Sequence, residues 1–205
     1  YIPSQSIVYK TQMSEFQEGV YLQAAEDKVS FRIAERRTSN FVFPDGGTGK
    51  DSFSSYLTKD GPDEYTANNE LASYLSDIER MRELTCKFAE TIEIEQQEIG
   101  NAFCFCEFKG AGGANTLGAC FKYQGFEQYT SNTSAFVGSS DSGALRPYCS
   151  NPSTTGSRRI NIAPYSSSQP YRFALITSDT PDTRIASILE LFNSPENFDG
   201  RYLKV

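Results

Sequence analysis

Histidine and tryptophan are both absent from the 205 residues of this chain. The lack of histidine excludes Ser-His and Cys-His catalysis, zinc bound through imidazole, and proton transfer by an imidazole side chain. The commonest enzyme active sites are therefore excluded. Without tryptophan, aromatic contacts come from phenylalanine and tyrosine, which make up 13% of the residues.

Apolar residues are also scarce, at 38% of the chain, so we expect one domain with a modest core and loose ends. No apolar run approaches the roughly 20 residues that cross a bilayer, and no basic amphipathic helix indicates membrane insertion. The net charge of −7 argues against a nucleic-acid partner, because phosphate binding relies on clustered lysine and arginine.

The first half of the chain is typical of helices. Residues 1–12 have no helical stripe and predict an extended N-terminal arm. In the region 13–109, apolar residues recur at spacings of three and four, which predicts two long helices. One covers Ser14–Arg37, with a weak point near Ser30. The other covers Leu71–Phe103, as one helix of about 30 to 40 residues or two in line.

The second half has a different composition. Residues 110–169 are rich in glycine, serine, threonine and asparagine, and predict long loops that wrap over a surface. Residues 170–205 predict a small β-α-β tail, in which a strand, a short helix and a second strand follow one another. The expected fold class is therefore mainly α with long loops and a small β-α-β element at the C-terminus.

Two glycine-rich stretches resemble nucleotide-binding loops but depart from them in detail. In "GGTGKDS", Pro44 stands where a phosphate loop needs glycine, and Asp51 stands where it needs serine or threonine. In "GAGGANTLG", Asn115 breaks the dinucleotide-binding spacing. Both stretches are interpreted as turns. The glutamates that follow residue 89 spread over several helix faces, as on a solvated surface.

Five cysteines carry the most informative pattern: Cys86, Cys104, Cys106, Cys120 and Cys149. A zinc site is not indicated, because the single C-x-C pair has no second pair to complete it. An odd number also leaves one thiol over in any disulfide framework. On a continuous helix, the first two would lie roughly 27 Å apart and could not bond to each other. Small buried hydrophobic side chains and anchors for an attached group both stay open as interpretations.

Cations and aromatic rings accompany these thiols. Arg80, Arg82 and Lys87 flank the first cysteine, and Lys109, Lys122 and Arg146 lie near the later ones. In this respect the chain resembles the gamma subunits of red-algal phycoerythrin, which are chromophore-bearing phycobilisome linkers, although its acidic charge differs from their usual basic character. The resemblance implies bilins of phycoerythrobilin or phycourobilin type on the cysteines. Arginine and lysine would pair with propionates, and Asp77 or Glu107 would accept pyrrole N–H bonds.

The sequence thus favours a non-enzymatic assembly protein of a light-harvesting complex. The resemblance implies phycobiliprotein alpha and beta subunits as partners and a place in the chloroplast, on the stromal face of the thylakoid. The chain begins at Tyr1 without methionine, which fits removal of a leader in plastid import or export. The alternative is an extracellular, disulfide-stapled binding domain without pigment, with a glycosylation sequon at Asn132.

Overall fold

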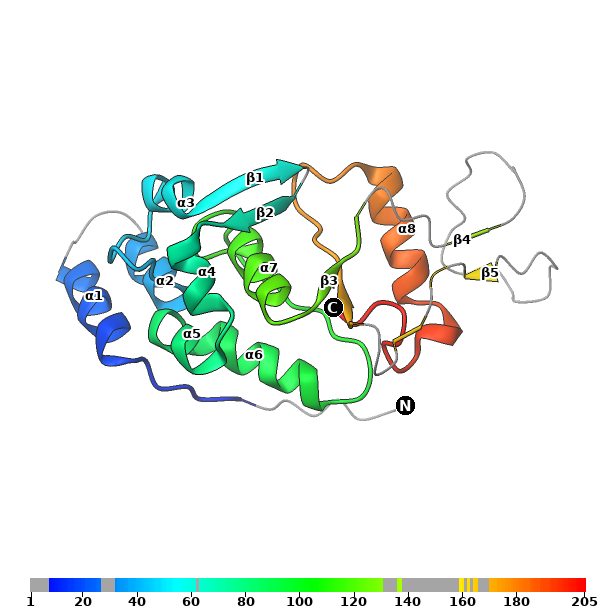
Figure 1. The fold of residues 1–205 in the computed structure, drawn as a ribbon, viewed down its shortest axis with the longest axis horizontal. Coiled ribbons are helices and arrows are strands. Elements are labelled where there is room, and N and C mark those ends of the chain that lie inside the picture. The colour runs from blue at the N-terminus through cyan, green and yellow to red at the C-terminus, as the bar shows by residue number, and fades with distance from the viewer. Residues whose placement is uncertain are drawn as a thin grey trace. The chain divides into compact units, whose positions relative to one another are not determined.

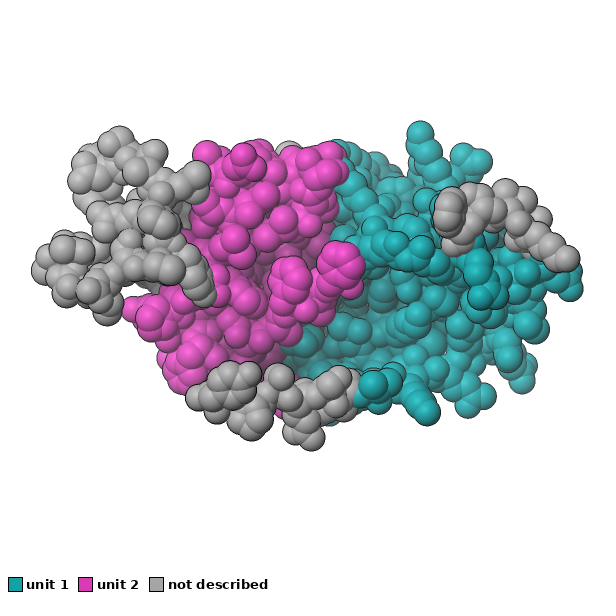
Figure 2. Space-filling model, turned by 180° about the vertical axis from the view of Figure 1, so that it is seen from behind, with its two compact units in different colours: residues 1–97, 106–124 teal, residues 98–105, 125–205 magenta. Residues whose placement is uncertain are grey.

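The computed structural model describes residues 8–26, 32–61, 63–130, 136–137, 159–160, 162, 164–165 and 170–205. The chain forms two compact units: unit 1 contains residues 1–97 and 106–124, and unit 2 contains residues 98–105 and 125–205 (Figure 2). Helices dominate the described residues and strands are few and short (Figure 1), so the chain is mainly α with a small β part, as predicted. Residues 8–14 contain neither helix nor strand, and the rest of the predicted arm lies outside the described residues.

Unit 1 is a helical body with one antiparallel hairpin. At the end of the hairpin Gly61 pairs with Glu64, and Asp63 has a positive φ of 59°. The helices of unit 1 are α1 (Glu15–Glu26), α2 (Ile33–Asn40), α3 (Lys50–Tyr56), α4 (Asn69–Leu75), α5 (Ile78–Leu84), α6 (Cys86–Gln97) and α7 (Ala114–Tyr123), and its strands are β1 (Leu57–Gly61) and β2 (Glu64–Ala67).

The core of unit 1 is built on an aromatic segment that directly follows α2. Phe41, Val42 and Phe43 are fully buried, and the Val42 amide donates a hydrogen bond of 3.0 Å to the carbonyl oxygen of Leu84. The ring of Phe43 stacks on Tyr56 with centroids 5.6 Å apart. Aromatic rings bury large apolar areas, so this short segment fixes α3 and α5 in the same core.

The prediction of one long helix, or two in line, over Leu71–Phe103 is wrong, because this region forms three short helices, α4, α5 and α6. Each begins at a side chain that accepts a backbone N–H bond. Asn68 accepts from Leu71 at 2.9 Å, Asp77 from Glu79 at 3.0 Å, and Thr85 from Phe88 at 3.2 Å. Such caps favour a helix start over a helix interior. The last helix ends at Gln97, so the helical spacing expected between Cys86 and Cys104 does not apply.

The region expected to be loops, residues 110–169, contains the most buried helix of unit 1. In α7, seven of the residues are buried, from Asn115 through Phe121. Its helical stripe escaped prediction because glycines precede it and Gly118 lies within it. The predicted first helix is likewise interrupted: α1 ends at Glu26 and α2 begins at Ile33, after Arg32 with a φ of 55°.

Unit 2 holds a small sheet whose segments run in one direction. Strands β3 (Glu127–Gln128) and β6 (Arg172–Phe173) pair in parallel. The amide of Lys204 donates to the carbonyl of Arg172 at 2.8 Å, and the amide of Ala174 donates to Val205 at 2.7 Å. The C-terminal segment thus lies beside β6, where the predicted second strand of the tail belongs, although it is too irregular to count as a strand.

A fourth segment, residues 98–105, lies on the other side of the C-terminal segment. The Ala102 amide donates to the carbonyl of Lys204 at 2.7 Å, and a Cβ on Gly200 would stand 2.4 Å from the carbonyl oxygen of Gly100. Since 100 lies by 200 and 102 by 204, the two segments run in the same direction. Side by side, the order of the segments is therefore 98–105, the C-terminal segment, β6 and β3.

Unit 2 is completed by α8 (Asp182–Phe192), which confirms the helix expected in the tail, by the 3-10 helix η1 (Pro195–Asn197), and by the pair β4 (Phe136–Val137) and β5 (Arg159–Ile160). Its core contains Tyr129, Ile188, Leu191 and Leu203. The remaining residues of the predicted wrapping loops lie outside the described part of the chain.

Candidate functional site

The candidate site is the glycine loop, residues 106–113, which lies within unit 1 and leads into α7. Its carbonyl groups cap that helix. The amides of Gly113, Ala114 and Asn115 donate to the carbonyl oxygens of Gly110, Phe108 and Lys109 at 2.9, 2.8 and 2.8 Å. The first N–H groups of a helix are the donors that bind phosphate in nucleotide-binding loops. Here those donors are already used, so the start of α7 is not a phosphate site.

Two glycines allow this loop to fold tightly. A Cβ at Gly113 would stand 2.1 Å from the carbonyl oxygen of Phe108. At Gly112 the φ is +62°, and a Cβ there would stand 2.9 Å from the carbonyl oxygen of Arg37. Side chains other than hydrogen therefore do not fit at these positions.

The end of α2 is fixed to the loop by Asn40. Its Nδ2 donates to the carbonyl oxygen of Gly112 at 3.0 Å, and the backbone oxygen of Asn40 accepts a 2.6 Å bond from the Thr85 hydroxyl. Lys87 Nζ donates to Asn40 Oδ1 at 3.4 Å and to Ser39 Oγ at 3.1 Å. The loop, α2 and α6 are thus held together by one polar network.

Two arginines of α2 lie over an aromatic ring of this loop. The guanidinium carbons of Arg36 and Arg37 are 5.7 and 5.2 Å from the centroid of the Phe108 ring. Arg36 also forms an ion pair with Glu107, and both side chains are about half exposed. The Nε of Arg37 is buried and has no hydrogen-bond partner among the described residues. We name these three residues, Arg36, Arg37 and Phe108, the arginine–phenylalanine cluster.

Four of the five cysteines predicted as anchors are described, and they lie in separate parts of the fold. Cys86 is buried and its Sγ is 3.4 Å from the hydroxyl of Thr11. Cys120 is fully buried in α7, where burial raises the pKa of its thiol. Cys106 is half-buried at the glycine loop, and burial also raises its pKa. Cys104 is half-buried in unit 2, and Cys149 lies outside the described residues.

No disulfide joins any two of the four described cysteines. Attachment to Cys86 or Cys120 would require the surrounding core to open, since both are buried. Cys106 is the thiol that the structure brings to the polar network, with Asn40 Nδ2 at 3.9 Å from its Sγ. Bilin attachment and the stapled alternative both stay predictions.

The charged residues predicted to bind the chromophore have partners within the protein. Asp77 accepts the amides at the start of α5, and Arg80 donates to the carbonyl of Ser73 at 3.1 Å and lies 4.6 Å from the Tyr74 ring. Arg82 forms ion pairs with three carboxylates, those of Glu79, Glu90 and Glu93. Among these predicted residues, Lys87 belongs to the network at the glycine loop.

Sequence reasoning did not identify the arginine–phenylalanine cluster or Asn40. The signal was present in part, because Arg36 and Arg37 are adjacent basic residues and Phe108 directly precedes Lys109. Nothing in the sequence, however, joins two segments about 70 positions apart. Within the described residues, no group of three or more histidine, cysteine or carboxylate side chains is arranged to hold a metal ion. No helix in those ranges has the length and apolar character to cross a membrane.

Comparison with known proteins finds no matching family model. A protein of Invertebrate iridescent virus 3 named "Putative helicase 087L" is 24% identical over 201 residues. The similarity covers 93% of this chain and 17% of the viral protein. The chain therefore spans a small part of the length of this relative, and the similarity extends over both units.

Proposed function

We propose that this chain is a nucleic-acid-binding lobe of a helicase-type motor, and that the arginine–phenylalanine cluster contacts the nucleic acid. The observation that carries the proposal is the placement of Arg36 and Arg37 over Phe108, in the glycine loop of unit 1. The similarity to a viral protein named as a helicase supports the same class of partner.

The chemistry of the cluster suits a phosphate backbone. A guanidinium that packs its face on an aromatic ring keeps its N–H edge free for an oxyanion, and it binds phosphate in a forked, two-bond geometry. Arg36 is about half exposed, and its present partner Glu107 is a surface carboxylate that a phosphate can replace. Phe108 supplies the ring that holds both arginines in position.

This proposal departs from the expectation drawn from the net charge of −7. Counterion release depends on the few cations that touch phosphate, and not on the charge of the whole protein. Three carboxylates elsewhere, those of Glu79, Glu90 and Glu93, are engaged by Arg82. A local basic site on an acidic lobe therefore binds weakly and with strong salt dependence.

Nucleotide hydrolysis is not assigned to this chain. In the turn that resembles a phosphate loop, the Asp45 carboxylate accepts the Gly47 amide at 2.8 Å and the Ser52 hydroxyl at 2.9 Å. A carboxylate occupies the turn that would hold phosphate, and like charges repel. The expectation that the chain itself is not an enzyme agrees with this proposal, since motor activity would need further polypeptide.

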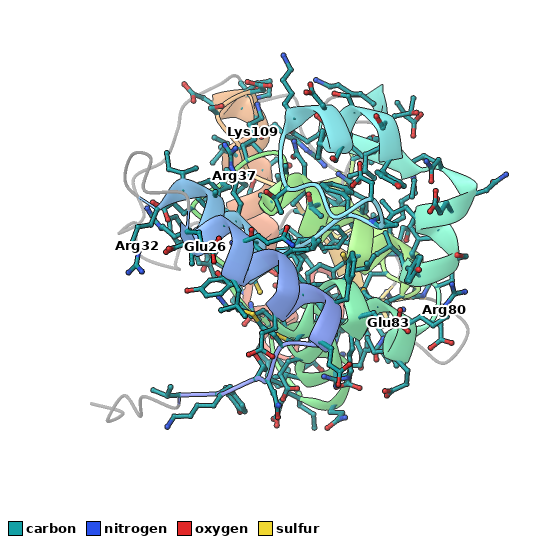
Figure 3. All side chains as sticks on the ribbon, turned by 90° about the vertical axis from the view of Figure 1, so that its left-hand side faces the viewer. Glu26, Arg32, Arg37, Arg80, Glu83 and Lys109 are labelled. Atoms are coloured by element: carbon teal, nitrogen blue, oxygen red, sulfur yellow. The ribbon has the colours of Figure 1, made fainter. Side chains whose placement is uncertain are left out.

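Binding of a fluorescent single-stranded oligonucleotide, followed by anisotropy, tests the proposal. We expect the Arg36→Ala, Arg37→Ala double variant to weaken binding by about tenfold or more and to reduce the salt slope by about 1 to 2. Arg80→Ala is the matched control, because Arg80 also lies on an aromatic ring, far from Arg37 in Figure 3. Equal binding by the double variant and the control would reject the cluster as the contact.

The linker role with covalent bilins stays a prediction. It differs from the motor proposal in the absorbance and mass expected of the denatured chain. The denatured chain from its native source would show visible absorbance and bilin-sized mass increments if it carries pigment. The motor proposal expects a colourless chain with unmodified cysteines. Visible absorbance that follows the chain under denaturing conditions would count against the motor proposal.

A further inference from the structure

The segment 98–105 has the exposure pattern of an extended strand with one open face. Along residues 101 to 105, exposed and partly buried positions alternate one by one, which is the period of an extended strand. Phe103 and Phe105 lie on the exposed side, with 75% and 83% of their surfaces accessible. Large aromatic side chains rarely stay this open in pairs on one strand, so this face is suited to contact with another element.

The backbone of this segment is bonded on one edge. The Ala102 amide donates to Lys204, so in an extended strand the peptide groups of Phe103 and Phe105 point to the opposite edge. Neither residue makes a backbone hydrogen bond to another described residue. An edge with free donors and acceptors is a template for a further strand.

We propose that this edge takes a fifth, parallel strand from the longer polypeptide of which the chain is one lobe. The crossover helix of that strand would cover Phe103 and Phe105. The direction is set by β3 and β6, which pair in parallel, and by the backbone hydrogen bonds that join the C-terminal segment and segment 98–105 beside them. Parallel sheets are covered by helices on both faces, and a parallel strand enters through a crossover of a dozen or more residues, usually helical.

The similarity to the viral protein indicates where the fifth strand would come from. The matching part is 17% of that protein, so there the counterpart of this lobe belongs to a much longer chain that can supply the strand. In this respect the inference rests on the proposed function, which takes the chain as one lobe of a motor. It does not depend on nucleic-acid binding by Arg36 and Arg37, and the two are tested by different variants.

The test compares one double variant, Phe103→Ser with Phe105→Ser, in the 205-residue chain and in the polypeptide that its native source makes. In the 205-residue chain we expect the melting temperature to change by less than about 2 °C, since both rings are exposed. In the native polypeptide we expect a loss of about 5 °C or more, because the rings are covered there. Phe198→Ser is the control, as Phe198 is a similarly exposed ring of the same unit.

Hydrogen exchange of the unmodified proteins gives a second measurement that needs no variant. The amides of Phe103 and Phe105 should exchange about tenfold more slowly, or slower still, in the native polypeptide than in the 205-residue chain. Equal exchange in both would overturn the proposal. So would a native product no longer than these 205 residues, or a dimer of the chain that the double variant separates, since the edge would then take a second copy.

Discussion

A Cβ on Gly113 would stand 2.1 Å from the carbonyl oxygen of Phe108, closer than any side chain tolerates. The same carbonyl oxygen accepts the amide of Ala114, so the contact cannot be relieved without loss of a cap of α7. We expect Gly113→Ala to destabilise unit 1 by at least about 2 kcal/mol. Gly110→Ala is the control, because a Cβ there meets nothing within 4 Å.

Urea unfolding followed by circular dichroism measures both glycine variants. If Gly113→Ala and Gly110→Ala unfold at the same urea concentration, the tight geometry of the glycine loop is wrong. A destabilised Gly113→Ala with weakened oligonucleotide binding would additionally connect the shape of the loop to the arginine–phenylalanine cluster.

Thr85 is the residue that separates α5 from α6, and we expect Thr85→Val to be costly despite its similar shape. Its buried hydroxyl donates to the Asn40 carbonyl at 2.6 Å and accepts from the Phe88 amide at 3.2 Å. Loss of both bonds should reduce the free energy of unfolding by about 1 to 3 kcal/mol. Thr91→Val serves as the control, because the Thr91 hydroxyl donates to the Lys87 carbonyl within the same helix, α6.

These caps also explain how far the sequence could predict the helices. Hydrophobic spacing located the helical region correctly, since the buried residues of α4, α5 and α6, including Leu71, Met81 and Ile92, belong to the predicted stripe. Spacing does not report where a helix stops. The stops depend on Asn68, Asp77 and Thr85, which are common capping residues and were visible in the sequence.

The sheet and the candidate site were beyond sequence reasoning for a different reason. Strands β3 and β6 have two residues each, too few to show alternation. Residues 101–105 alternate in exposure, but the large rings of Phe103 and Phe105 lie on the exposed side, which is the reverse of the usual pattern. The arginine–phenylalanine cluster joins residues some 70 positions apart, and only tertiary packing brings them together.

Lys204 is almost completely buried, and we expect Lys204→Met to loosen unit 2. Its Nζ donates to the carbonyl oxygens of Glu98 and Gly100 at 2.6 and 2.7 Å, which fastens the start of the segment 98–105 to the C-terminal segment. Methionine fills a similar volume but leaves both carbonyls without this donor, at a cost of about 1 to 3 kcal/mol each.

Hydrogen exchange at the Ala102 amide measures this loosening directly, because that amide donates to the backbone oxygen of Lys204. Exchange should be faster in Lys204→Met and unchanged in Lys59→Met, whose lysine is exposed on β1. An Ala102 amide that is equally protected in both variants would show that the ammonium group does not hold the segment.

Burial of Cys120 predicts a loss of stability at alkaline pH. Because burial raises the pKa of this thiol above its ordinary value of 9.0, the folded state holds the proton more tightly than the unfolded state. The stabilisation of the folded state by the protonated Cys120 thiol is fully present below pH 9. Above pH 9 the free energy of unfolding falls by up to about 1.4 kcal/mol per pH unit. In Cys120→Ala this decline is absent, although removal of the sulfur from the core lowers stability at every pH.

We therefore expect the difference in unfolding free energy between wild type and Cys120→Ala to narrow between about pH 9 and about pH 10.5. Parallel urea-unfolding curves across that interval would mean that the Cys120 thiol ionises equally in both states, which its buried position in α7 does not allow.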